Sequence, residues 1–118
     1  ELLFIAGADL ATPMDVQSKA RRIGMEEVGW LEMQTDGIAG SLKPLKSFIF
    51  SGGSKQAAAL HVARAVCRRA ERSVVLLSES EVCNTKLLPF FNRLSSLLFV
   101  LARQADKDAG VKEEEWKG

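Results

Sequence analysis

Apolar residues recur at intervals of three and four along most of the chain, which is the pattern of amphipathic helices. Strand signals are weak, because tyrosine is absent and β-branched residues rarely alternate with polar ones. The pattern predicts helices over Glu1–Ala11, from Met25 to a point before Pro44, over Lys55–Leu77, and from Asn84 or later to about Ala105. Long helices joined by short links favour an antiparallel bundle. The predicted fold class is all-α, with one helical-bundle domain over residues 1–118.

Proline and glycine mark the predicted helix ends. Pro13 and Pro44 follow the first and second helices, since the residue before a proline disfavours helical conformation. Gly52 and Gly53 permit a tight turn before the third helix. Pro89 falls early in the fourth apolar pattern, so this helix either has a kinked first turn or begins late.

The third helix carries a broad apolar arc and an arginine-rich stripe. At about 100° per residue, the arc that we expect to face the core contains Ala59, Val62, Ala63, Val66, Cys67, Ala70, Val74 and Leu77. A narrow stripe beside this arc contains Arg64, Arg68 and Glu71. The side expected to face water contains His61, Arg69 and Arg72.

Arg64 and Arg68 lie one turn apart on this stripe and repel each other weakly. Glu71 offers too little negative charge for two guanidinium groups at the edge of a core. Arginine holds carboxylate or phosphate through two parallel hydrogen bonds, which lysine does not do. Two interpretations remain open: ion pairs to acids of neighbouring helices or subunits, or a bound phosphate or nucleotide.

The fourth helix has a thick apolar stripe, predicted to be core, of Leu87, Phe90, Phe91, Leu94, Leu97, Leu98 and Leu101. The opposite side contains Asn92, Ser95, Ser96, Phe99 and Arg103. Asn92 either faces solvent or, with Phe99 on the same side, belongs to a subunit contact or ligand groove. In the preceding loop, Phe48 or Phe50 either clips the loop to the bundle or forms an aromatic wall against a large flat ligand.

Composition narrows the function classes further. The 118 residues carry a formal net charge of +1, so net charge gives no support for nucleic-acid binding. Cys67 and Cys83 form no CxxC pair, and with one histidine they predict no zinc site. No apolar run reaches the roughly 18 residues that span a bilayer. We expect no metal-binding residues, no membrane partner and reduced thiols in a cytoplasmic protein.

Three segments taken together resemble a known family. The chain contains LKSFIFSGG, AALHVARAVCRRAER and FFNRLSSLLFVLAR in this order. They are similar to segments of the ATP:cob(I)alamin adenosyltransferases of the propanediol-utilisation type, and the similarity is dense from about Leu45 to Arg103. The resemblance implies a bundle of five helices that assembles as a homotrimer with active sites between subunits.

The resemblance also implies an activity. Cobalt of cob(I)alamin would attack the 5′ carbon of ATP, supplied with Mg²⁺, to give adenosylcobalamin and triphosphate. By position, Arg68, Glu71 and Asn92 match residues of the ATP site, and Arg64 matches an arginine that pairs with an acid across the subunit interface. Phe48 matches an aromatic residue that crowds the lower face of the corrin and displaces its axial base. A corrinoid reductase and an adenosylcobalamin-dependent mutase or dehydratase would be partners, and a eukaryotic protein would lie in the mitochondrial matrix.

The chain departs from the family pattern in three respects. A glycine- and threonine-rich nucleotide segment resembling TRTGDxGTT is expected upstream of Glu1. Ser51 stands where proline is usual, and Ser96 stands where aspartate is usual. These departures leave an alternative open, a non-catalytic module that binds or delivers cobalamin or a nucleotide. A basic helical nucleic-acid binder, based on the arginines alone, would show steep salt dependence.

Overall fold

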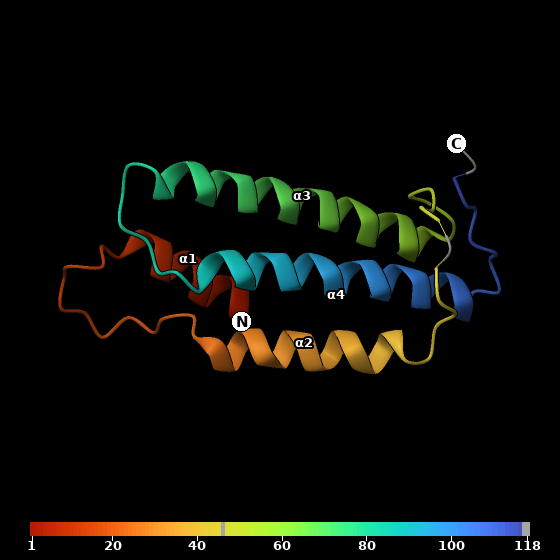
Figure 1. Ribbon diagram of the computed structural model, residues 1–118, viewed down its shortest axis with the longest axis horizontal. Helices are drawn as coiled ribbons and strands as arrows, with labels where there is room; N and C mark the ends of the chain where they lie inside the picture. The colour runs from red at the N-terminus through yellow and green to blue at the C-terminus, as the bar shows by residue number, and fades with distance from the viewer. Residues whose placement is uncertain (46, 117–118) are drawn as a thin grey trace.

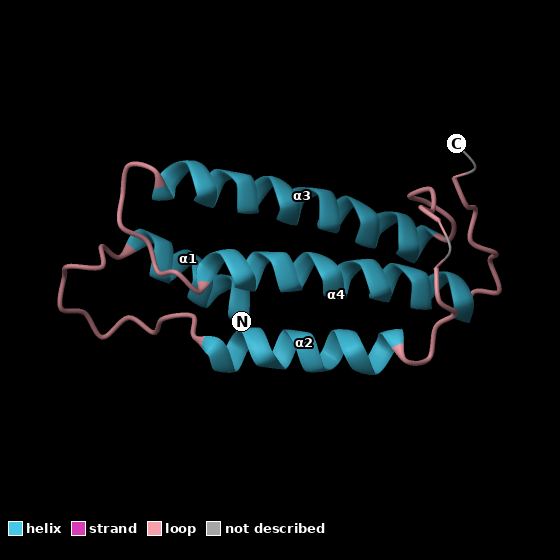
Figure 2. Ribbon diagram, viewed as in Figure 1, coloured by secondary structure: helices cyan, strands magenta, loops and turns pink. Residues whose placement is uncertain are grey.

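The computed structural model describes residues 1–45 and 47–116, and these residues form four α-helices (Figure 1). The helices are α1 (Leu2–Ala11), α2 (Met25–Ala39), α3 (Lys55–Ser78) and α4 (Leu87–Asp108). Apart from one isolated β-bridge between Ile49 and Glu115, the described segments contain helices and loops (Figure 2). The all-α prediction is confirmed.

The bundle is elongated, with extents of 51 × 27 × 23 Å, and α4 lies between α3 and α2. Helix α3 runs antiparallel to α4, whereas α2 and α4, which also pack against each other, run in the same direction (Figure 1). The predicted antiparallel arrangement therefore holds for α3 and α4 but not for α2 and α4. Because α4 has a neighbour on each flank, it buries more than one stripe. The buried residues of α4 are Leu87, Phe90, Phe91, Leu97, Val100, Ala102, Arg103 and Asp106.

Two residues on the side opposite the predicted core stripe of the fourth helix are buried or half-buried. Arg103 is only 7% exposed and forms an ion pair with Glu113, with 2.6 Å between Nε and Oε1. Phe99 is half-buried and packs against the core cluster. The predicted core stripe therefore left out part of the buried surface of α4, because α4 is enclosed from two directions.

The predicted orientation of the third helix was right in part: Cys67 and Val74 of the predicted arc are buried, but other members of the arc are not. The residues that α3 buries are Ala57, His61, Cys67 and Val74, whereas Val62 is 64% and Val66 47% exposed. His61, expected on the water-facing side, is only 5% exposed. Helix α3 packs mainly against α4, so it buries a narrow face, and much of its apolar arc remains on the surface.

The helix ends follow local chemistry. Glu27 Oε2 accepts a hydrogen bond of 2.9 Å from the backbone N–H of Gly24, and Ser54 Oγ accepts one of 3.1 Å from Ala57 at the start of α3. Helix α4 begins late, at Leu87, which places Pro89 in the first turn, where its missing N–H removes no helical hydrogen bond. Helix α2 ends at Ala39, and Leu42 packs against the core from outside the helix.

A buried carboxylate joins three segments at one end of the bundle. Asp9, 2% exposed, accepts hydrogen bonds of 2.7 Å from Arg22, 2.8 Å from the N–H of Ile23 and 2.7 Å from Asn84. Burial alone would raise the pKa of Asp9, but these donors together outweigh it and hold the pKa below its usual value. The network fixes α1 to the loop before α2 and to the loop before α4.

Candidate functional site

Glu71 and Asn92 meet across the contact between α3 and α4. The side-chain amide of Asn92 donates to Glu71 Oε1 at 3.4 Å, and Asn92 Oδ1 accepts a hydrogen bond of 2.6 Å from Arg93. Arg93 also donates from Nε to Glu32 Oε1 at 2.8 Å. A polar chain therefore crosses the bundle from α2 through α4 to α3, and it fixes which end of the Asn92 amide points toward Glu71.

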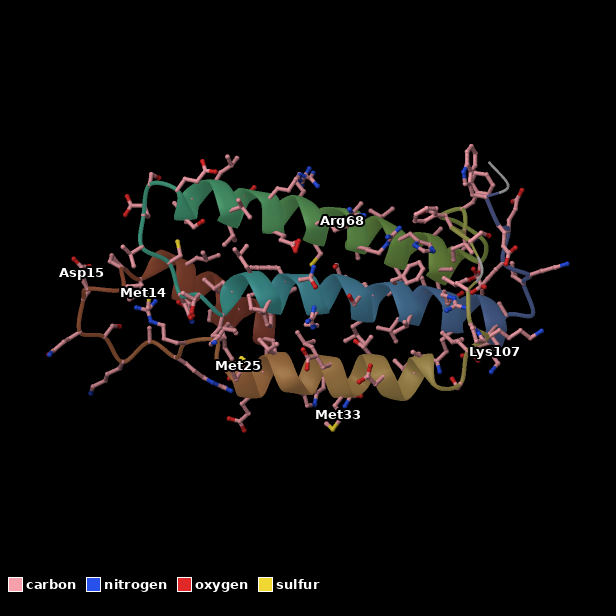
Figure 3. The ribbon with its side chains drawn as sticks, in the orientation of Figure 1. Met14, Asp15, Met25, Met33, Arg68 and Lys107 are labelled. Carbon is pink, nitrogen blue, oxygen red and sulfur yellow. The ribbon has the colours of Figure 1, made fainter. Side chains whose placement is uncertain are left out.

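Arg68 lies on α3, three residues before Glu71 (Figure 3). Its side chain is exposed and has no ion-pair partner among the residues that the structure describes. The guanidinium is therefore available to an anion from outside this set of residues.

Arg64 has a different environment, one turn earlier on α3. Its Nη2 donates to Ser51 Oγ at 3.3 Å, and its Cζ lies 5.2 Å from the centroid of the Phe99 ring. Its Nε is buried with no hydrogen-bond partner in the described chain. Burial and the positive charge of Arg68 lower the pKa of Arg64. No acid of the described residues pairs with Arg64, so the ion-pair interpretation is not supported for neighbouring helices of the same chain, and an acid of another subunit or a bound phosphate stays open.

Phe48 lies in the loop that leads to α3, and its side chain is 82% exposed. This loop is at the N-terminal end of α3, whereas Arg68 lies thirteen residues into the helix, about 20 Å along its axis. The structure therefore does not bring Phe48 next to Glu71 and Asn92. Arg64, which contacts Ser51 of the Phe48 loop, lies between the two regions.

Residues that sequence reasoning left out of the site line the same face of α3. The imidazole of His61 lies 6.2 Å from the Phe99 ring, and its Nδ1 is buried without a partner among the described residues. Burial and the charge of Arg64 lower the pKa of His61, with Asp106 acting in the opposite direction. The spacing of Ala57, His61, Arg64, Cys67, Glu71 and Val74 by threes and fours was the signal that marks this face.

Two cavities lie at opposite ends of the bundle. One, of about 660 Å³, is lined by Asp9 to Asp15, Leu77, and Glu81 to Asn84 with Leu87. The other, of about 1550 Å³, is lined by Gly40 to Leu45, Phe50, Arg103, Lys107 and Val111 to Trp116. Met14 and Asp15 mark the first end and Lys107 the second (Figure 3). Neither lining includes Arg64, Arg68, Glu71 or Asn92, which lie on the flank of the bundle.

Metal ligation is not indicated by side-chain clusters. Within residues 1–45 and 47–116 there is no group of three or more histidine, cysteine, aspartate or glutamate side chains able to hold a metal ion. Cys67 is buried and donates to the backbone oxygen of Phe91 at 3.3 Å, and burial followed by the charge of Glu71 raises the pKa of its thiol. Both cysteines are free thiols, and no helix in the described part of the chain is long and apolar enough to cross a membrane.

The family model for cobalamin adenosyltransferases matches residues 1–105. The chain belongs to the cobalamin adenosyltransferase family. It is 39% identical over 115 residues to a corrinoid adenosyltransferase of Bacillus subtilis, an alignment that covers 98% of this chain and 58% of the relative. It is 40% identical over 123 residues to the corrinoid adenosyltransferase MMAB of Mus musculus, covering 98% of this chain and 51% of the relative.

A solved structure has the same fold. A PduO-type ATP:corrinoid adenosyltransferase from Lactobacillus reuteri, determined as a variant complexed with cobalamin and ATP, superimposes with a TM-score of 0.93 at 37% identity. The superposition covers 99% of this chain and 65% of that one. The chain thus spans between about half and two thirds of the length of these relatives.

Proposed function

We propose that this protein is a corrinoid adenosyltransferase that transfers the 5′-deoxyadenosyl group of ATP to cob(I)alamin. In this reaction the electron pair of Co(I) forms a bond to the 5′ carbon, and the bond between that carbon and its oxygen breaks. The bonding electrons leave with triphosphate, which is released with its Mg²⁺. Family membership over residues 1–105 supports the reaction class, and the relatives bound to cobalamin and ATP support the two substrates.

The contact between Glu71 and Asn92 beside a free arginine is the observation that carries the proposal. We assign Arg68 to the phosphates of ATP, because its guanidinium is exposed and unpaired within the described chain. A leaving triphosphate gains negative charge in the transition state, and a fixed guanidinium group stabilises that charge. Glu71 and Asn92 offer a carboxylate and an amide to the nucleoside part, with Arg93 orienting the amide.

Phe48 is assigned to the corrin. An exposed ring on a loop offers a flat apolar surface to one face of a macrocycle. Crowding of the lower face would displace the axial base and favour reduction of the cobalt to the nucleophilic Co(I) state. Arg64 contacts Ser51 of the same loop and is assigned to an acid of a neighbouring subunit, because its charge is half-buried without an acid among the described residues.

We further propose that the protein acts as a homotrimer, with residues of two subunits at each site. The outer face of α3 exposes Val62, Val66 and Leu76, and α1 exposes Leu3 and Phe4, with Phe4 83% exposed. Exposed apolar side chains in such number on two helices are consistent with a subunit interface. Light scattering after size-exclusion chromatography tests this assembly, and Val66→Asp is expected to dissociate it, whereas a monomeric parent protein would contradict it.

The chemistry of the substrates also implies partners. Reduction of Co(II) to Co(I) requires an electron donor, so a corrinoid reductase must precede the reaction. Adenosylcobalamin serves as the cofactor of radical enzymes, which points to a mutase or dehydratase that receives it.

Replacement of Arg68 tests the proposed activity. In the full-length protein, Arg68→Ala is expected to lower the rate of adenosylcobalamin formation from reduced cobalamin and ATP by at least about 100-fold, as removal of a group that stabilises transition-state charge does. Arg72→Ala is the matched control, because Arg72 is also exposed and lies one turn further along α3. Equal rates for Arg68→Ala and the parent protein would refute the assignment. A parent protein that binds both ligands without turnover would instead indicate a delivery module.

A further inference from the structure

Asp106, near the C-terminal end of α4, fits directly against the glycine turn that precedes α3. Its side chain is buried, with the residue 5% exposed, and Oδ1 accepts a hydrogen bond of 2.7 Å from the backbone N–H of Ser54. Gly53 has a φ of +96°, and a Cβ at this position would overlap the carboxylate of Asp106. The turn and the carboxylate therefore fix each other's positions, because glycine is needed both for the backbone conformation and for the close approach.

The segment that follows α4 holds the other end of the same loop. The N–H of Trp116 donates to Phe48 O at 2.6 Å, and the N–H of Phe50 donates to Glu114 O at 2.8 Å. The rings of Phe50 and Trp116 meet edge to face with their centroids 5.8 Å apart. The backbone on both sides of Ile49 is thus paired with residues 114–116, and Ile49 and Glu115 form an isolated antiparallel β-bridge.

The paired segment is itself anchored to α4. Arg103 donates to Glu113 Oε1 at 2.6 Å and to the backbone oxygen of Lys43 at 2.6 Å. The N–H of Val111 donates to the backbone oxygen of Asp106 at 2.8 Å. The C-terminal part of α4 thereby holds the loop of residues 47–54 at two places. Asp106 holds the glycine turn directly, and Arg103 holds the Phe48 end indirectly, through residues 113–116.

We propose that Asp106 is a positioning residue that sets the location of the Phe48 ring against the corrin. The Phe48 side chain is 82% exposed, so contacts of the ring itself contribute little to its placement, and the backbone of the loop determines it. The backbone is fixed at Ser54 by a buried carboxylate and at Phe48 by Trp116. This inference rests on the proposed role of Phe48, and Asp106 does not itself touch the substrate.

The test compares Asp106→Ala with Asp106→Asn in the full-length protein. Asparagine retains an oxygen that can accept from the Ser54 N–H, whereas alanine leaves this donor unpaired. Asp106→Ala is expected to raise KM for cob(I)alamin about tenfold, the equivalent of one hydrogen bond to a charged group, while KM for ATP changes by less than about twofold. With cob(II)alamin and ATP, the absorption change that reports loss of the axial base should shrink. In Asp106→Asn, KM for cob(I)alamin and the absorption change should both return to those of the parent protein.

Two further variants separate the possible outcomes. Asp106→Glu keeps the charge but adds a methylene against the Gly53 turn, so it should raise KM for cob(I)alamin in the same way and provides the measurement if the alanine variant does not fold. Equal changes in both KM values, or an unchanged cob(II)alamin spectrum, would overturn the positioning role. Phe48→Ala distinguishes this result from failure of the proposed function: if it also leaves binding of cob(I)alamin and the spectrum unchanged, the role of Phe48 itself is wrong.

Discussion

The guanidinium of Arg64 lies over the ring of Phe99, with its Cζ 5.2 Å from the ring centroid. The two side chains come from different helices, α3 and α4, and both are half-buried. Arg64 has no ion pair among the described residues, so the ring face is its principal partner beside Ser51. A cation placed in this way is attracted by the negative face of the ring.

A double-mutant cycle should detect this attraction. Arg64→Met and Phe99→Leu, alone and combined, are expected to show a coupling of about 1 kcal/mol in the free energy of unfolding, measured with urea. Arg72→Met combined with Phe99→Leu is the control, because Arg72 is exposed elsewhere on α3, and it should be additive within about 0.5 kcal/mol. Additivity of the Arg64 pair would show that the stacked geometry contributes no stability.

Removal of the Asp9 carboxylate should be among the most destabilising single changes in the chain. Asp9→Ala leaves the charge of Arg22 and the amide of Asn84 without their acceptor, and breaking a buried ion pair in this way costs about 3–5 kcal/mol. Asp15→Ala, in an exposed loop, should change the free energy of unfolding by no more than about 0.5 kcal/mol. Urea denaturation measures both, and similar values for the two variants would contradict the role of the network.

The same carboxylate predicts a loss of stability in acid. The pKa of Asp9 is lower in the folded chain than its ordinary value of 3.8, so its contribution is complete above that pH and is lost as the pH falls through the folded pKa. Unfolding curves of the parent protein should therefore converge with those of Asp9→Asn as the pH falls below 3.8 and through the lowered pKa of the folded chain. Curves that stay equally separated at every pH would argue against this linkage.

His61 predicts a second pH dependence, at a higher pH. Burial and Arg64 lower its pKa below the ordinary value of 6.5, while Asp106 of α4 opposes this shift. The unfolded chain then binds a proton more readily than the folded chain, so stability should fall as the pH decreases below about 6.5. It is the one histidine in the sequence, so His61→Leu should flatten the change in melting temperature between about pH 7 and pH 5. An equally steep fall in this variant would exclude His61 as its source.

The sequence was sufficient for the elements but not for their orientation. The positions of Pro13 and Gly53 located the end of α1 and the start of α3, because these residues restrict the backbone locally, whereas α2 ends at Ala39, well before Pro44. The buried face of α3 could not be predicted from hydrophobicity, since the helix buries His61 and half-buries Arg64 while it exposes Val62 and Val66. Apolar spacing alone does not identify which part of a broad apolar arc is covered by the core of the same chain.

Only some of the site residues could be predicted from the sequence, because contacts between helices do not appear in the spacing along one helix. Glu71 and Asn92 were grouped through the family resemblance, while spacing along the chain does not reveal a contact between residues of two helices. Arg93 and Asp106 were missed, because their roles depend on partners distant in the sequence, Glu32 and Ser54. Their signal was weak: a charged residue within or beside an apolar helix stripe.

The orientation of the Asn92 amide leads to a last prediction, for the ATP side of the site. Asn92→Asp keeps the oxygen that accepts from Arg93 but replaces the amide group that donates to Glu71 with a second negative oxygen. Two carboxylates at about the present separation of 3.4 Å repel, so at least one of them should take up a proton at a higher pH than usual. KM for ATP is therefore expected to rise by several-fold at pH 8 and to recover in part at pH 6.

Ser96→Asp is the matched control, because it adds the same charge one turn along α4, four residues from Asn92. It should change KM for ATP by less than about twofold, with no recovery at lower pH. If Asn92→Asp changes KM for ATP as little as Ser96→Asp does at both pH values, the Asn92 amide affects ATP binding neither through Glu71 nor by direct contact with the nucleotide. If KM for ATP rises in Asn92→Asp but does not recover at pH 6, the new carboxylate does not lie beside Glu71. In that case we expect it to turn toward α2 and to pair with Arg93.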